Sequence, residues 1–152
     1  MAKTLRFRPV NRLHQASEFS AVFQYRRVIR GKLFDLHWRL DGALNDAVAS
    51  DKLSSARLGL VVPKRLARRA VMRNLMKRIV RENFRQQLAN LPTIDLVLKL
   101  SRKPDAQALG CDCVRPSDPV FRQRIAKDIH SLFHGLSLAL EKHRAAKNGQ
   151  AT

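Results

Sequence analysis

The chain has 152 residues, of which 45% are hydrophobic, and this suits one compact domain with its own core. Thirty Lys and Arg residues face twelve Asp and Glu residues, so the formal net charge is +18 at pH 7. This excess opposes compaction and favours a polyanionic partner, either a nucleic acid or an anionic membrane. No uncharged apolar stretch approaches the roughly 20 residues that span a bilayer, so we expect a soluble, cytoplasmic protein without a membrane partner.

The start of the chain is basic and contains no acid before Glu18. This composition is compatible with a mitochondrial presequence or with a basic arm that contacts phosphate groups. Ser17 is a plausible N-cap, and the following "EFSAVFQ" spaces Phe19, Val22 and Phe23 three and four residues apart. We therefore expect a first short helix with an apolar side.

Alternation of apolar and polar residues in "LFDLHWRL", residues 33–40, predicts a half-buried strand. Its apolar face contains Phe34, Leu36, Trp38 and Leu40. Residues 41–55 are rich in Gly, Asn, Asp and Ser without a clear period, which indicates a long connection. The next strand, "ARLGLVVPK", should end at Pro63, because proline lacks the N–H donor that a strand ladder needs.

A basic turn, "KRLARR", precedes a predicted helix from Ala70 to about Leu88. The apolar run "IDLVLKL" predicts a buried strand, and the breaker-rich "SRKPDAQALGCDCVRPS" predicts a second loop. Asp118 and Pro119 form a cap and first-turn pair for a terminal helix that should end near His143.

These elements predict a small α/β sandwich, with residues 1–144 as one domain and residues 145–152 as a flexible tail. Cys111 and Cys113 have no second pair at zinc spacing, so two reduced thiols on a loop are favoured over a metal or redox role.

The helix that begins at Ala70 divides into two arcs of about 140° when each residue advances by about 100°. The apolar arc, which should pack on the sheet, contains Val71, Met72, Leu75, Met76, Ile79 and Val80. The opposite arc collects five cations and an amide: Arg73, Asn74, Lys77, Arg78, Arg81 and Arg85. Like charges four residues apart repel each other by a few tenths of a kcal/mol, so an ordinary solvated face would alternate its signs. The pattern favours a ridge that docks against closely spaced phosphates.

Phe84 and Leu88 interrupt the cationic arc, and we expect the end of the helix to tilt into the protein there. Cations also precede the helix, where the macrodipole already presents positive charge. They are Lys64, Arg65, Arg68 and Arg69. Their positions are easier to explain if an anion binds at this helix N-terminus, which extends the ridge into a patch.

The run "RLGLVVPKRLARRAVMRNLMKRIVRENFR" resembles the protein subunit of bacterial ribonuclease P, whose hallmark is an arginine-asparagine basic motif on a helix after a Gly-containing strand. The resemblance includes "SEFSAVFQ" and "IDLVLKLSRKP" and covers about residues 10 to 104. It implies a two-layer α/β sandwich with about four strands in a mixed sheet and three helices. It also implies a left-handed crossover between parallel strands, against the usual handedness.

In that family the protein assists a catalytic RNA. The resemblance therefore implies that the catalytic RNA and precursor tRNA are the partners, with no obligate protein partner. The RNA-contacting motif falls on Arg68, Arg69, Arg73, Asn74, Lys77, Arg78 and Arg81. A cleft near the first helix takes the single-stranded leader, and Phe19 and Phe23 match its aromatics. Mg²⁺ would be held mainly by the RNA, with none bound tightly by the protein.

One departure from the family pattern is Leu75, which stands where a second arginine usually follows the asparagine of the motif. On the helical wheel Leu75 points into the apolar arc, so one expected cation is lost while the ridge remains. The connection around "GCDCVRPSD" also looks longer than in compact members of the family.

Other interpretations remain open at the level of the sequence. Phe19 and Phe23 either stack on unpaired bases or pack in the core. The same charge suits a structural ribosomal RNA-binding or assembly protein that has no catalytic partner. An independent nuclease needs acids gathered for metal binding, and the twelve acids are scattered, although Asp35, Glu82 and Asp95 lie on adjacent predicted elements. We predict no catalytic residue in the polypeptide.

Overall fold

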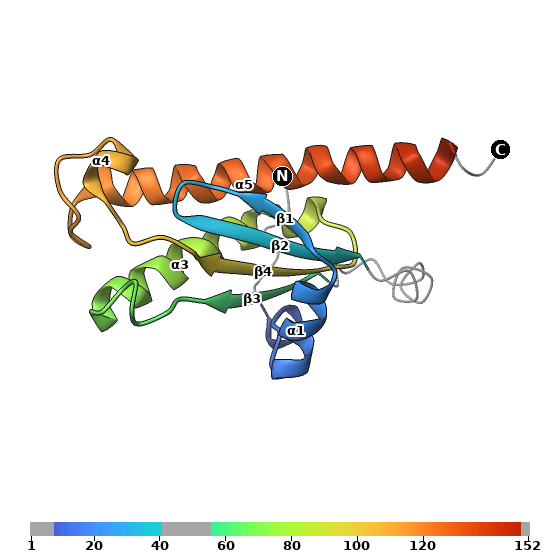
Figure 1. The fold of residues 1–152 in the computed structure, drawn as a ribbon, viewed down its shortest axis with the longest axis horizontal. Coiled ribbons are helices and arrows are strands. Elements are labelled where there is room, and N and C mark those ends of the chain that lie inside the picture. The colour runs from blue at the N-terminus through green and yellow to red at the C-terminus, as the bar shows by residue number, and fades with distance from the viewer. Residues whose placement is uncertain (1–7, 41–55, 150–152) are drawn as a thin grey trace.

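The computed structural model describes residues 8–40 and 56–149. Its four strands are β1 (Arg27–Arg30), β2 (Phe34–Leu40), β3 (Arg57–Val61) and β4 (Ile94–Leu100). They form one sheet in the order β1-β2-β4-β3, in which β3 runs parallel to β4 and the other pairs are antiparallel (Figure 1). The predicted four-stranded mixed sheet is confirmed. The connection predicted over residues 41–55 lies outside the described residues.

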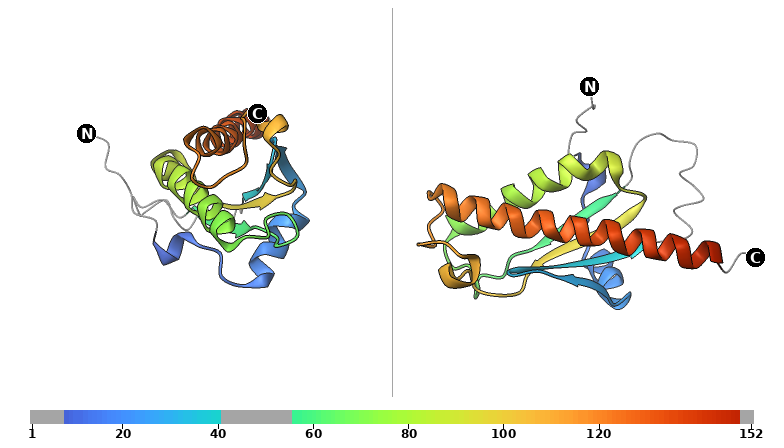
Figure 2. Two further views of the ribbon diagram at one scale, coloured as in Figure 1. Left: turned by 90° about the vertical axis from the view of Figure 1, so that its left-hand side faces the viewer. Right: turned by 90° about the horizontal axis from the view of Figure 1, so that it is seen from above.

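Three longer helices cover the sheet. They are α1 (Ala16–Gln24), α3 (Ala70–Gln87) and α5 (Pro119–Gly149). The shorter helical elements are η1 (Pro9–Asn11), η2 (Leu88–Asn90) and α4 (Ala106–Leu109). Helices α3 and α5 lie side by side on one face of the sheet, and α1 lies on the other face (Figure 2). The helix α3 connects β3 to its parallel neighbour β4, which is the strand-helix-strand unit that the family resemblance implies.

The main core lies between the sheet and the pair of helices α3 and α5. Phe34, Leu36 and Trp38 point into it, as the alternation in β2 predicts. A smaller core under α1 contains Leu13, Val22 and Val97, with Phe19 and Phe23 packed against it. Strand β4 contributes to both cores, which explains why its sequence is an almost continuous apolar run.

The first helix begins earlier than predicted, and Ser17 is not its N-cap. Gln15 occupies the cap position, and Ser17 lies inside α1. The carboxylate of Glu18 accepts hydrogen bonds from the backbone N–H groups of His14, at 2.8 Å, and Gln15, at 3.4 Å. A side chain at the third helical position thus satisfies donors that would otherwise be orphaned.

The C-terminal half of the chain is more helical than predicted. Helix α5 continues to Gly149 instead of ending near His143, because "EKHRAAKN" consists mostly of good helix formers. The predicted second loop contains α4, which Asp105 caps and which ends at Gly110 with a φ of 68°. None of the helices in residues 8–40 and 56–149 has an apolar segment of the length that a bilayer crossing requires.

Candidate nucleic-acid interface

Helix α3 packs its apolar side against the core and turns its cationic side outward. Met72, Leu75, Met76 and Val80 are buried, as predicted. Val71 belongs to the same predicted arc, but it is 57% exposed because it lies in the first turn, at the margin of the helix contact. Burial of Leu75 agrees with the wheel prediction that this departure from the family pattern points inward.

The end of α3 tilts into the protein. Phe84 and the following Leu88 have exposed fractions of 0% and 1%, which confirms the prediction made from their interruption of the cationic arc. The ring of Phe84 lies 6.5 Å from that of Phe133 on α5. The outward cationic stretch therefore ends near Arg81, and the last turn of α3 is anchored in the core.

Arg73 has a structural role that the sequence pattern does not reveal. Its Nη1 donates hydrogen bonds to the backbone carbonyl oxygens of Ala67, at 3.0 Å, and Arg68, at 2.7 Å. These bonds tie the basic turn before α3 to the first turns of the helix. Arg73 is half-buried, so it positions its exposed neighbours Arg68 and Arg69.

Most other cations of the cationic arc have no acidic partner among the described residues. No described acid forms an ion pair with Lys77, Arg78 or Arg81. The exception is Arg85, whose Nε lies 3.0 Å from Oε2 of Glu82. This hydrogen bond raises the pKa of Arg85 and lowers the pKa of Glu82.

The cations that remain available form a surface that we call the α3 ridge. It consists of seven cations, Lys64, Arg65, Arg68, Arg69, Lys77, Arg78 and Arg81, together with the exposed amide of Asn74. Lys77 is half-buried, and the other members are exposed. The like charges repel one another in the free protein, so an approaching polyanion gains from neutralising them.

The α1 face of the sheet presents aromatic and basic side chains. Phe23 meets His37 edge to face, with ring centroids 4.8 Å apart, and Nζ of Lys99 lies 5.9 Å from the centroid of the Phe23 ring. Burial lowers the pKa of His37. Both Phe19 and Phe23 are half-buried, so part of each ring packs in the smaller core and part remains accessible.

Gly59 on β3 allows Phe19 to pack closely against the sheet. A Cβ atom at Gly59 would come within 2.7 Å of Cζ of Phe19 and 3.1 Å of Cδ1 of Leu13. The glycine in "RLGLV", which is part of the family resemblance, therefore has a packing explanation here.

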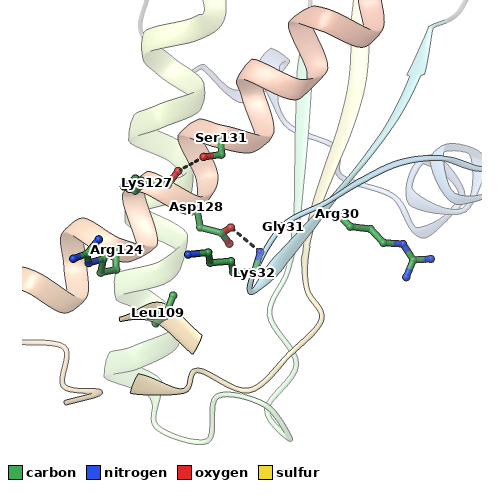
Figure 3. A pocket seen from close by; sticks show the side chains of 8 residues that line it. All are labelled: Arg30, Gly31, Lys32, Leu109, Arg124, Lys127, Asp128 and Ser131. Carbon is green, nitrogen blue, oxygen red and sulfur yellow. Dashed lines mark hydrogen bonds between the residues drawn. The ribbon is translucent and has the colours of Figure 1, made fainter. Parts of the chain in front are cut away.

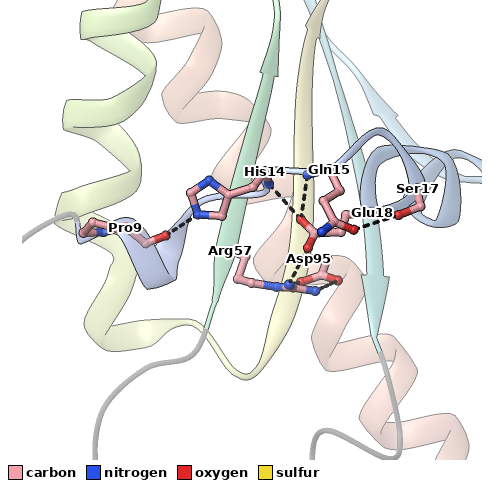
Figure 4. A network of polar contacts seen from close by, with 7 residues as sticks. All are labelled: Pro9, His14, Gln15, Ser17, Glu18, Arg57 and Asp95. Atoms are coloured by element: carbon pink, nitrogen blue, oxygen red, sulfur yellow. Dashed lines mark hydrogen bonds and ion pairs between the residues drawn. The ribbon is translucent and has the colours of Figure 1, made fainter.

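An ion network fixes α1 to the strands (Figure 4). Arg57 binds the carboxylate of Asp95 through two hydrogen bonds of 2.8 Å, and its Nη1 lies 3.5 Å from Glu18. Asp95 is only 5% exposed. The backbone N–H of His14 is the main cause of a lowered pKa for Glu18. These acids serve as structural partners of Arg57.

The three acids considered for an independent nuclease do not meet. Asp35 pairs across the sheet with Lys99, four positions from Asp95 and thus about 13 Å along β4. Glu82 lies on α3, which covers the face of the sheet opposite to α1, whereas Asp95 is bound in the ion network with Glu18 of α1. In residues 8–40 and 56–149, no three His, Cys, Asp or Glu residues are grouped to hold a metal ion.

The two cysteines are free thiols, as predicted. Sγ of Cys113 lies 3.2 Å from Oδ2 of Asp118, and this hydrogen bond raises the pKa of the Cys113 thiol. Cys113 is therefore held as a protonated donor beside the start of α5.

The fold and this surface define a class: small α/β proteins in which a helix between parallel strands carries an outward cationic ridge. A family model described as Ribonuclease P matches residues 7–110, and the chain belongs to this family.

Similar curated proteins are named "Ribonuclease P protein component". The one from Azoarcus sp. is 48% identical over 62% of this chain and 71% of its own length. The one from Nitrosomonas eutropha is 35% identical over 81% of this chain and 84% of its own. Among solved structures, the RNase P protein of Staphylococcus aureus gives a TM-score of 0.59 at 18% identity, covering 82% of this chain and 93% of that one, which establishes likeness of fold.

Proposed function

We propose that this protein is the protein subunit of ribonuclease P, which binds a catalytic RNA and promotes endonucleolytic removal of the 5′ leader from precursor tRNA. The observation that carries the proposal is the α3 ridge, in which seven cations lack an acidic partner among the described residues. Membership of the Ribonuclease P family supports ribonuclease P RNA as the partner. The site of action is the cytoplasm, and no protein partner is required.

The leader binds on the α1 face of the sheet in this proposal. Phe19 and Phe23 offer partly exposed rings on which unpaired bases can stack, and Lys99 supplies a cation beside them. Stacking of this kind contributes about 1 to 3 kcal/mol per base and accepts any base. The leader is thus held without strong sequence preference.

Catalysis in this proposal belongs to the RNA. Mg²⁺ at the scissile phosphate is held mainly by the RNA, and the protein binds none tightly. The cations of the protein lower the repulsion between two polyanions, the catalytic RNA and the precursor, and so increase the affinity of the complex.

Reconstitution tests the proposal directly. The protein and ribonuclease P RNA are combined at low Mg²⁺, and removal of the leader is measured. We expect the protein to restore cleavage that the RNA alone performs poorly. If the protein cleaves without the RNA, or prefers ribosomal RNA and restores nothing, the proposal is wrong.

The ridge is tested by the triple variant Lys77→Gln, Arg78→Gln, Arg81→Gln. Each neutralised phosphate releases a counterion. The slope of log affinity for ribonuclease P RNA against log salt should therefore flatten by roughly 2 to 3 units in this variant. The matched control is Arg26→Gln, Arg30→Gln, Lys103→Gln, which removes the same charge from exposed positions outside the α3 ridge. Equal slopes in the two variants would refute the assignment of the ridge. Arg73 is left intact, because its loss would also release the basic turn.

A further inference from the structure

A second group of cations lies between α5 and the edge strand β1, away from the α3 ridge. Helix α3 packs along one side of α5, and β1 packs along another (Figure 2). We call the six cations of this group the β1–α5 basic surface: Arg27, Lys32, Arg124, Lys127, Lys142 and Lys147. They line two depressions, one on each side of a close contact between Ile29 and Gly135.

The first depression has a volume of about 250 Å³ and lies where the β1–β2 turn meets α5 and α4. Lys32 of the turn and Arg124 of α5 extend into the same space, above Leu109 (Figure 3). Lys127 and Ser131 complete its α5 side. Arg30 also borders the depression, but its guanidinium group points away from Lys32 and Arg124 (Figure 3).

The turn that carries Lys32 is clamped to α5. The buried carboxylate of Asp128 accepts hydrogen bonds from three consecutive backbone N–H groups, those of Lys32 at 2.8 Å, Leu33 at 3.0 Å and Phe34 at 3.3 Å. Both oxygens of Asp128 are thus occupied by backbone donors. From the other side, Nη1 of Arg102 donates to the carbonyl oxygen of Gly31 at 2.7 Å. The backbone of Lys32 is therefore held beside α5 before any ligand arrives.

The second depression has a volume of about 540 Å³ and lies beside the C-terminal half of α5. Lys142, His143 and Lys147 line it from α5, and Arg27 lines it from β1. The guanidinium carbon of Arg27 lies 5.6 Å from the ring centroid of Trp38, which holds this cation in place.

Charge and length indicate the ligand. Among the residues that line the two depressions, Asp128 is the only acid, and its oxygens are occupied by backbone donors. Arg124 and Lys142 are 18 residues apart on one helix, which corresponds to about 27 Å. This span is too long for one small anion and suits a chain with several phosphates. The large hydrophobic side chains exposed on α5 are Val120 and Leu138, which lie 18 residues apart and form no continuous apolar face, so insertion into a bilayer is disfavoured.

We propose that the β1–α5 basic surface is a second RNA-binding site, which takes the phosphodiester backbone of an RNA segment other than the one on the α3 ridge. The inference rests on the proposed function, because that function brings two RNAs to the protein. Helix α3 packs along one side of α5 and β1 along another (Figure 2), so the two sites are built on different elements around α5. The site also lies largely on α5, beyond the residues 7–110 that the family model matches.

Two double variants test the two depressions: Arg124→Gln with Lys127→Gln, and Lys142→Gln with Lys147→Gln. These side chains are exposed on α5, and glutamine is a good helix former, so the fold should be retained. We expect each double variant to flatten the slope of log affinity against log salt by roughly 1 to 2 units. The control is Lys103→Gln with Arg115→Gln, which removes the same charge from exposed residues that line neither depression and should leave the slope unchanged.

Binding is measured to ribonuclease P RNA alone and to precursor tRNA in the assembled enzyme. A flatter slope with ribonuclease P RNA assigns the surface to the catalytic RNA. A flatter slope only with precursor tRNA assigns it to the precursor. A wild-type slope with both RNAs in either double variant overturns the assignment of the depression that it lines. The proposed function fails separately, when the wild-type protein neither binds ribonuclease P RNA nor restores cleavage, and the second site then fails with it.

Discussion

Asp128 shows how one buried acid organises a cationic surface. It is 6% exposed, and it accepts the backbone N–H groups of three residues in the β1–β2 turn. The turn also excludes a side chain at Gly31, where a Cβ atom would lie 2.7 Å from Oδ1 of Asp128. Asp128 and Gly31 together allow the β1–β2 turn to pack against α5, and this turn carries Lys32.

We predict that Asp128→Ala destabilises the protein by about 3 kcal/mol or more, because it leaves buried backbone donors without an acceptor. Asp128→Asn retains one accepting oxygen and should cost less. Urea unfolding followed by circular dichroism measures both values. The neighbouring Arg124→Gln serves as control and should change stability by less than about 0.5 kcal/mol. A loss below about 1 kcal/mol for Asp128→Ala would show that the turn does not depend on this carboxylate.

At this scale the sequence predicts side-chain direction better than side-chain partners. The wheel places Leu75 inside correctly, because burial follows the helical period. Phe84 and Leu88 fall in the cationic arc of the same wheel, and their apolar character correctly indicates that the end of the helix tilts into the protein. It gives no sign that Arg73 binds the carbonyl oxygens of the preceding turn, since that contact depends on how the turn folds back. The sequence also gives no sign that Asp128 is buried, because an acid in an amphipathic helix is ordinarily a surface residue.

The attachment of α1 to the sheet depends on the absence of a side chain at Gly59. We predict that Gly59→Ala costs about 1 to 3 kcal/mol, because the added methyl group overlaps the ring of Phe19. In a Phe19→Ala background the same change should cost much less, since the ring is gone. Urea unfolding of the four proteins of this cycle gives the coupling energy. An equal cost of Gly59→Ala in both backgrounds would mean that the ring does not press on β3.

Elements with a strong period were predictable, and short or context-dependent elements were not. The boundaries of α3 and β4 follow from their apolar patterns. Strand β1 was missed, because "RVIR" is four residues long and mostly exposed, and its strand state comes from pairing with β2. The last turns of α5 do not follow from apolar periodicity, because the apolar pattern fades before the helix propensity of the sequence does.

For the molecule as a whole, the net charge of +18 opposes folding and favours the binding of RNA. In the free protein, compaction brings like charges together, as on the α3 ridge, and this lowers the free energy of unfolding. Salt screens that repulsion, with a Debye length of about 10 Å at 0.1 M ionic strength. Added salt should therefore stabilise the fold. In the complex, the same salt competes with counterion release and weakens binding.

We therefore predict that raising NaCl from about 50 mM to about 500 mM increases the urea midpoint of the free protein while it lowers the affinity for ribonuclease P RNA. The variant Lys77→Gln, Arg78→Gln, Arg81→Gln should show a smaller change in both measurements, because the same side chains produce both effects. Sucrose at matched osmotic strength separates charge screening from general stabilisation, since it leaves the repulsion intact. A midpoint that does not respond to salt, or that responds equally in the wild type and the variant, would mean that these cations do not oppose folding.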